Sequence, residues 1–122
     1  MPREIKNAKI ISTSLGGEDH GIFTIYIHLD YGGVCQAFGG WSLDTPDKKS
    51  PKEFHKGRVG TAYGMNFIMN VLHTLGVSTW EKLPGTYCRV IAEHHVVHAI
   101  GHLLEEKWFN PSEDMERWLG EE

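Results

Sequence analysis

The most suggestive chemistry in this sequence lies where a glycine-rich run leads into an amphipathic segment. The run reads Gly57-Arg58-Val59-Gly60-Thr61-Ala62-Tyr63-Gly64. Backbone N–H groups at the start of a helix bind anions, because the helix dipole lies behind them. Arg58 adds a fork-shaped donor suited to phosphate, and Thr61 adds a hydroxyl. The spacing is not that of a P-loop, so two interpretations stay open: an anion site, or glycines that let a helix pack tightly.

A second glycine pair stands between two aromatic residues, in Phe38-Gly39-Gly40-Trp41. A planar base could stack on Trp41 while a backbone N–H of the glycines meets its edge or a phosphate. The same four residues also fit the end of a strand that carries a β-bulge and two core aromatics.

Four histidines form a row: His94, His95, His98 and His102. On a helix, three of them would share one face and could bind zinc. The flanking Val96-Val97 and Gly101 favour a strand, and the glutamate of a zincin helix is missing beside His98. We therefore expect no metal, and we expect surface or edge-strand histidines of which one, His102, could reach a ligand.

Other catalytic signatures are missing from the sequence. It contains no G-x-S-x-G, no Cys–His pair at a recognisable spacing and no paired carboxylates in an apolar context. Asp19 and His20 are the acid–base pair to follow. Phe109 either packs the last helix onto the sheet or borders a pocket. These observations predict a small binding protein without catalytic residues or a cofactor.

The first half of the chain must position Gly39 and Trp41, and its periodicity is that of strands. Period-two alternation predicts strands over 5–14 and 22–30, and Gly32-Gly33 predicts a hairpin into a returning strand at 34–38. A turn-rich connection is expected over 15–21. Ala8, Ile10, Ser12 and Ser14 should share one face of the first strand. Residues 42–59 are polar or helix-breaking and predict a surface loop.

The second half must position Arg58 and the histidines. An amphipathic stripe predicts one long helix from about Gly60 to residue 75, stopped by Gly76. Ser78 should cap a short helix that ends before Pro84, and 86–92 with 96–102 should form a second hairpin. Asn110 should cap a last helix that runs to about Leu119. The expected fold is α+β: an antiparallel sheet packed by one long helix, with short additional helices.

Composition limits the class of protein. The chain has 122 residues, 40% of them hydrophobic and 23% charged, which predicts a single globular domain over 1–122. Its net charge of −4 argues against binding duplex nucleic acid through the backbone. The first residues have no apolar signal region and no run is long enough to span a membrane, so we expect a cytoplasmic protein. Cys35 and Cys88 are expected to be buried, reduced thiols.

The order of several segments resembles a family of small phage proteins, the first family of Thoeris anti-defence proteins or "sponges". The resemblance spans most of the chain outside 42–57. It is carried by Asn7-Ala8-Lys9-Ile10-Ile11-Ser12-Thr13-Ser14-Leu15, Glu18-Asp19-His20-Gly21, Phe38-Gly39-Gly40, Arg58-Val59-Gly60-Thr61-Ala62-Tyr63-Gly64, Ile100-Gly101-His102 and Lys107-Trp108-Phe109. These sponges bind and sequester cyclic ADP-ribose isomers without degrading them, and members are implicated in binding cyclic oligonucleotides. They form dimers and higher oligomers with shared pockets.

The resemblance implies that Gly39, Gly40 and Arg58 contact the phosphates of the ligand. It also implies that the protein acts inside an infected bacterial cell. A chain this small cannot easily enclose a dinucleotide-sized ligand alone, which favours a homodimer or higher homo-oligomer. Two alternatives stay open: a protein inhibitor of a bacterial defence effector such as a CRISPR nuclease, and a hydrolase or metal enzyme built on the histidine row. The nine predicted ligand-binding residues are Gly39, Gly40, Trp41, Arg58, Gly60, Thr61, Tyr63, His102 and Phe109.

Overall fold

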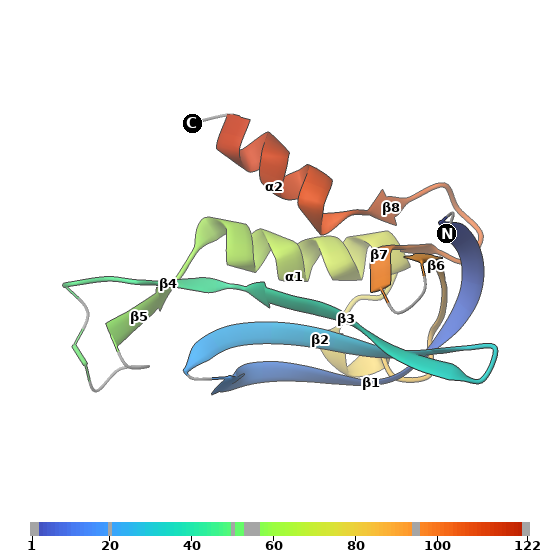
Figure 1. Ribbon diagram of the computed structural model, residues 1–122, viewed down its shortest axis with the longest axis horizontal. Helices are drawn as coiled ribbons and strands as arrows, with labels where there is room; N and C mark the ends of the chain where they lie inside the picture. Colours follow the sequence, from blue (N-terminus) through green and yellow to red (C-terminus); the bar gives the residue numbers. More distant parts are fainter. Residues whose placement is uncertain (1–2, 20, 50, 53–56, 94–95, 121–122) are drawn as a thin grey trace.

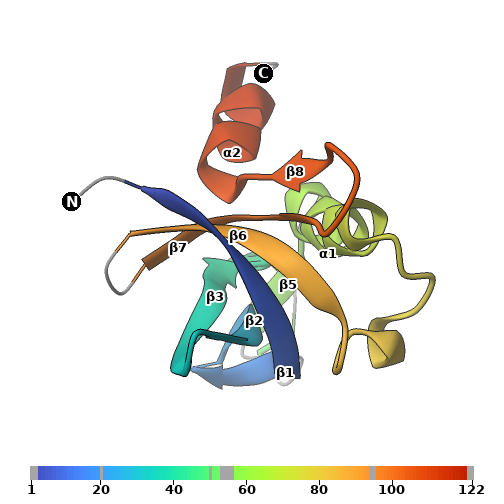
Figure 2. The same ribbon diagram turned by 90° about the vertical axis from the view of Figure 1, so that its right-hand side faces the viewer.

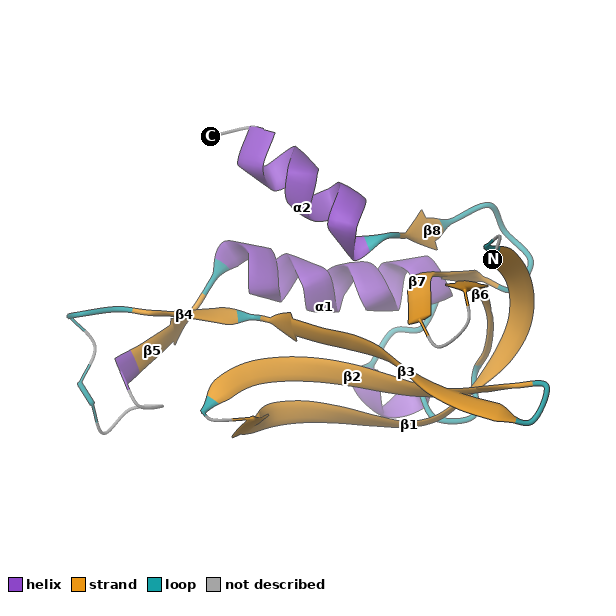
Figure 3. Cartoon of the chain, viewed as in Figure 1, coloured by secondary structure: helices purple, strands orange, loops and turns teal. Residues whose placement is uncertain are grey.

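The computed structural model describes residues 3–19, 21–49, 51–52, 57–93 and 96–120. The described strands form one six-stranded antiparallel sheet, in the order β3-β2-β1-β6-β7-β8, and a separate two-stranded ribbon, β4-β5 (Figures 1 and 3). A long helix, α1, and a shorter helix, α2, complete a fold that is α+β, as the sequence predicts. None of the described helices is both long and apolar enough to cross a membrane.

The predicted three-stranded meander is present, with longer strands than expected. It comprises β1 (Glu4–Asp19), β2 (Ile22–Tyr31) and β3 (Val34–Ser42). Gly32 and Gly33 have φ values of 67° and 82°, as a type I′ hairpin turn requires. The expected turn over 15–21 is wrong for most of its length, because Leu15 and Gly16 pair with Ile25 and Thr24. Pairing with a neighbouring strand supplies the hydrogen bonds that hold this glycine-containing segment extended.

A bulge in β1 changes which residues face the core. The pairing with β2 shifts between Ile10 and Ser12, so Ile10 lies opposite Leu29 and Thr13 lies opposite Ile27. Thr13 therefore joins Ile10 on the inner face, where its Oγ1 accepts a hydrogen bond of 3.0 Å from Trp80 Nε1. The prediction that Ser12 and Ser14 share the face of Ile10 is wrong, because one extra residue reverses the alternation.

The second predicted hairpin is confirmed as β6 (Tyr87–Glu93) and β7 (Val96–His102). β6 pairs with β1, and the two-residue β8 (Trp108–Phe109) pairs with the end of β7. The whole sheet curls, so that β3, at one end of the strand order, lies close to β7 near the other end (Figure 2).

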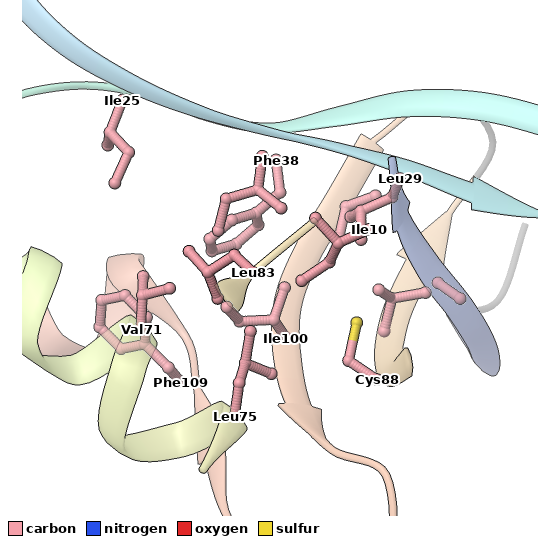
Figure 4. Close-up of a cluster of buried hydrophobic side chains, with 14 of the residues drawn as sticks. Ile10, Ile25, Leu29, Phe38, Val71, Leu75, Leu83, Cys88, Ile100 and Phe109 are labelled. Atoms are coloured by element: carbon pink, nitrogen blue, oxygen red, sulfur yellow. The ribbon is translucent and has the colours of Figure 1, made fainter. Parts of the chain in front are cut away.

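Helix α1 (Ala62–Leu75) closes the curled sheet, and both of its ends follow the sequence prediction. Thr61 is the N-cap and Gly76, with φ of 72°, is the left-handed C-cap. Its inward stripe includes Phe67, whose ring centre lies 6.3 Å from that of Phe38 on β3 and 4.9 Å from that of Phe109 on β8. The helix thus joins the two ends of the sheet through one hydrophobic core (Figure 4).

The shorter elements depart from the sequence predictions in two places. β4 (Asp44–Pro46) pairs with β5 (Arg58–Gly60), so part of the expected surface loop over 42–59 is a β-ribbon, which we call the arm. The segment after Gly76 forms a short 3-10 helix, η2 (Trp80–Lys82), and its N-cap is Thr79 rather than Ser78. The Ser78 hydroxyl instead accepts a hydrogen bond from Lys82 Nζ at 3.0 Å.

Helix α2 (Pro111–Gly120) begins as predicted. Asn110 Oδ1 accepts hydrogen bonds from the backbone N–H groups of Ser112 and Glu113, at 3.1 and 3.3 Å.

The prediction for the two cysteines is half correct. Both are free thiols, but only Cys88 is buried and Cys35, on the edge strand β3, is exposed.

Candidate functional site

The nine predicted ligand-binding residues do not meet in one place. Three of them line a pocket at the base of the arm: Arg58, Gly60 and Thr61. Gly39 and Trp41 line a different cleft, between β3 and β7. The other four line neither hollow and have separate surroundings, described below.

The first hollow, which we call the arm pocket, has a volume of about 230 Å³ and a mostly apolar lining. It lies where β4 and β5 meet the first turns of α1. Its lining residues are Phe23, Leu43, Asp44, Arg58, Val59, Gly60, Thr61, Gly64, Met65 and Ile68.

Arg58 carries the strongest charge in the arm pocket, and that charge is already paired. Its Nε lies 2.9 Å from Asp44 Oδ2 and its Nη2 lies 3.0 Å from Asp44 Oδ1, a bidentate ion pair. The two side chains are only 18% and 6% exposed. A phosphate would have to displace a carboxylate that is held in place by the fold. The guanidinium is therefore not the unpaired donor that the sequence interpretation assumed.

The surroundings of Asp44 keep it ionised. Burial acts to raise the pKa of Asp44, but hydrogen bonds from Arg58, the Phe23 backbone and Ser42, together with the charge of Arg58, outweigh it. The pKa of Asp44 is therefore lower than its usual value, and the pKa of Arg58 is raised by the hydrogen bond to Asp44.

The rest of the glycine-rich run serves the start of the helix. The Thr61 hydroxyl accepts a hydrogen bond from Gly64 N at 2.8 Å and lies 3.1 Å from the Leu43 carbonyl oxygen, to which it donates. A Cβ on Gly64 would collide with that same carbonyl oxygen, whereas a Cβ on Gly60 would meet open space. Tight packing of the helix therefore explains Gly64, and it does not explain Gly60.

The second hollow, which we call the β3–β7 cleft, has a volume of about 400 Å³ and a more polar lining. It lies where the curled sheet brings β3 against β7, beside the start of α2. Its lining residues are Ala37, Phe38, Gly39, Trp41, Val96, Val97, His98 and Ser112.

The glycine pair of β3 forms a bulge at this cleft. Gly39 has φ of 135°, and a Cβ there would collide with the carbonyl oxygen of Ile25 on β2. Gly40 has φ of 86°, and its Cβ would lie 3.2 Å from the Tyr26 hydroxyl. The register between β2 and β3 shifts between Thr24 and Tyr26, at the same place. The bulge interpretation is confirmed, and the bulge leaves Gly39 and Trp41 at the cleft.

His98 is one of the cleft residues that the predicted site did not include. Its Nε2 lies 3.3 Å from Glu93 Oε2, and Arg3 Nε lies 3.6 Å from the same oxygen. The carboxylate orients the imidazole, and both side chains are partly exposed. The signal in the sequence was the alternation of strand β7, which could place His98 on a face but could not show that β3 lies opposite.

The imidazole of His102, by contrast, is already hydrogen-bonded to the turn that follows β7. Its Nδ1 accepts hydrogen bonds from the backbone N–H groups of Leu104 and Glu105, at 3.1 and 3.0 Å. A Cβ on Gly76 would touch its ring.

His94, His95 and the Asp19–His20 side-chain pair fall outside the described part of the structure. Within the described residues, no three His, Cys, Asp or Glu side chains are grouped to hold a metal ion.

Tyr63 and Phe109 support the packing of the elements. The Tyr63 hydroxyl donates to the carbonyl of Pro111 at 3.4 Å, which ties α1 to α2. Burial raises the pKa of Tyr63 to about 12, with a contribution from the negative charge of Asp114. Phe109 is buried in the core against Phe67 and Phe38, where a ligand could reach it only if the core opened.

Comparisons of the chain with protein-family models, with known proteins and with solved structures found no significant match. The interpretation of both hollows therefore depends on their own residues. The β3–β7 cleft combines an indole, backbone exposed by a bulge and an imidazole with a carboxylate behind it. This combination can hold a planar, hydrogen-bonding, anionic molecule.

Proposed function

We propose that this chain is a binding protein that sequesters a cyclic nucleotide signal in the β3–β7 cleft without degrading it. Isomers of cyclic ADP-ribose are the first ligands to test, and cyclic oligonucleotides the second. The observation that supports this proposal is the convergence of Trp41, Gly39 and His98 on one cleft of about 400 Å³. Pockets for small molecules have volumes of about 300–1,000 Å³.

Each cleft residue has a part in binding such a ligand. A base stacks on the Trp41 indole, as bases do on aromatic side chains in proteins that bind single strands. His98, oriented by Glu93, donates to a phosphate. The bulge places Gly39 at the cleft, where its backbone can hydrogen-bond the ligand.

Ser112 supplies the one side-chain hydroxyl among the described residues that line the cleft. Ser112 lines the cleft together with His98, so a Ser–His–Glu hydrolase would be the enzymatic alternative. Among the hydrogen bonds of the described residues, none joins Ser112 Oγ to His98.

The biological setting that goes with this proposal is phage anti-defence. A phage-encoded sponge would act in the cytoplasm of the infected bacterium, where it would lower the free concentration of an immune signal. Its oligomeric state would matter, since a cleft open on one side can be completed by a neighbouring copy.

The test is calorimetric titration of the purified chain with a cyclic ADP-ribose isomer, followed by denaturation and recovery of the ligand. We expect saturable binding and intact ligand. Trp41→Leu keeps an apolar side chain but removes the flat ring, and should weaken binding about tenfold, since stacking on one aromatic residue contributes about 1–3 kcal/mol. His28→Ala serves as a surface control that should bind like wild type, because His28 is an exposed residue of β2 outside the cleft.

The outcomes separate the three classes of function. A cleaved ligand would identify an enzyme and overturn sequestration. Failure of every tested nucleotide signal to bind would overturn the proposal and leave the protein-inhibitor alternative. That alternative predicts a stable complex with a defence effector such as a CRISPR nuclease and no affinity for small molecules.

A further inference from the structure

The turn between β7 and β8 presents one leucine to solvent. Leu104 is 83% exposed, the highest value among the large hydrophobic side chains of the described residues. A single exposed leucine is ordinary on a protein surface. The turn that carries it, however, is held by several hydrogen bonds, which makes it a candidate contact surface.

Hydrogen bonds that involve side chains fix the turn around Leu104. His102 Nδ1 accepts from Leu104 N and Glu105 N, at 3.1 and 3.0 Å. Arg89 donates to the carbonyls of His102 and Glu105, both at 2.8 Å. Lys107 Nζ ties the end of the turn to the carbonyl of His73 at 3.2 Å. An apolar side chain on a preformed turn can bind with little further loss of conformational entropy.

The arm pocket is an apolar hollow of suitable chemistry for such a side chain. Phe23, Leu43 and Ile68 contribute to its lining, and Met65, 60% exposed, stands at its rim. The pocket touches the first half of α1 at Gly64 and Met65, whereas the Leu104 turn is tied to His73 and Gly76 at the other end of the helix. The arm, β4 with β5, and the turn between β7 and β8 lie at opposite ends of the molecule (Figure 1).

The charges beside the two surfaces are complementary. Glu105 and Glu106 follow Leu104. Glu105 pairs with Lys107 at 3.1 Å and Glu106 with Arg89 at 3.0 Å, but the glutamate side chains stay 60% and 79% exposed and can face a second partner. The described part of the segment that joins β4 to β5 carries exposed lysines at 48, 49 and 52, which we call the arm lysines, and one aspartate, Asp47. The exposed carboxylates beside Leu104 thus complement the lysines beyond the apolar pocket.

We propose that Leu104 of one copy of this chain inserts into the arm pocket of a second copy, with Glu105 and Glu106 facing the arm lysines. Two different surfaces meet in such a contact, so it is head-to-tail and either closes into a ring or continues along a filament. The contact uses no residue that lines the β3–β7 cleft. The contact between copies can therefore be tested independently of the proposed ligand binding.

Light scattering across a concentration series tests this contact. We expect the wild-type chain to assemble beyond 13.8 kDa, the mass of one chain. Leu104→Glu and Met65→Glu should each give a folded monomer. Met69→Glu is the matched control, because Met69 is 57% exposed on the same helix but does not line the pocket, and it should assemble like wild type. Circular dichroism confirms that each variant is folded.

Mixing the two defective variants gives the sharpest result. Leu104→Glu keeps an intact pocket and Met65→Glu keeps an intact leucine, so the mixture should form a 1:1 dimer and grow no further. Salt should weaken assembly of the wild type, because the lysine–glutamate attraction is screened. A wild-type chain that stays at 13.8 kDa, a mixture that stays monomeric, or a Met69→Glu variant as defective as Met65→Glu would overturn the proposal.

Discussion

The arm pocket and the β3–β7 cleft differ in how deeply the ion pairs of their polar side chains are buried. The arm pocket holds the better anion ligand, Arg58, but Asp44 binds it through both carboxylate oxygens. The cleft holds the Trp41 indole, the Ser112 hydroxyl and the His98 imidazole, whose ion pair with Glu93 is more exposed than that of Arg58 with Asp44. The comparison shows that residue type alone does not define a site, because a buried counter-charge can commit the strongest donor to the fold.

The glycines of the two regions differ in the same way. Gly39, at the cleft, stands against the Ile25 carbonyl in a left-handed conformation, while Gly60, at the arm pocket, has open space where a Cβ would be. One glycine is required by the fold and the other is free to change. This difference gives the largest effect that we predict.

Gly39→Val should destabilise the protein by about 3 kcal/mol or more, because it combines backbone strain with a steric collision. Gly60→Val should change stability by less than about 1 kcal/mol, because its side chain enters open space. Urea unfolding of both variants measures the two free energies. Equal losses would mean that the bulge at Gly39 is not a constraint on the fold.

Asp44→Asn should destabilise the arm at neutral pH, because it leaves Arg58 without its counter-charge. The folded-state pKa of Asp44 lies below its unfolded value, which is about 3.9. The stabilisation by Asp44 is therefore complete above about pH 4 and is lost as the pH falls through the folded-state pKa.

The measurement is the difference in urea midpoint between the wild type and Asp44→Asn from pH 7 to pH 2. The difference should be constant from pH 7 to about pH 5 and should shrink below about pH 4. A difference that does not change with pH would show that ionisation of Asp44 contributes nothing to the fold.

Arg58→Met should have a smaller effect on ligand affinity than Trp41→Leu, even though the sequence places Arg58 first among the phosphate contacts. We expect affinity for a cyclic ADP-ribose isomer to fall less than about threefold, because the guanidinium is committed to Asp44. Calorimetry of the folded variant checks this. A hundredfold loss of affinity would indicate that the ligand binds in the arm pocket.

Cys35→Ser should have the smallest effect, changing the free energy of unfolding by less than about 0.5 kcal/mol, because Cys35 is exposed on β3.

A thiol reagent should modify Cys35 in the native protein but not Cys88, whose burial raises its pKa to about 12. Protection of Cys88 then reports on the core: Asp44→Asn should keep it protected, and Gly39→Val should expose it. Rapid modification of both thiols in the native wild type would contradict this assignment.

The amino-acid sequence by itself determined the elements whose signals are local. Gly32-Gly33 specified its turn, the stripe from Phe67 to Leu75 specified the buried face of α1, and Gly76 and Asn110 specified helix ends. Such signals act over a few residues, through backbone conformations and hydrogen bonds that need no distant partner. The α+β class followed from them.

Only the tertiary structure decided which side chains have partners and which face each one takes. The bulge after Ile10 reversed the alternation of β1, and pairing of β4 with β5 brought Asp44 to Arg58, 14 positions along the chain. The curl of the sheet brought His98 to the cleft with Trp41. These outcomes depend on contacts between strands far apart in sequence, and periodicity along one strand carries no information about them.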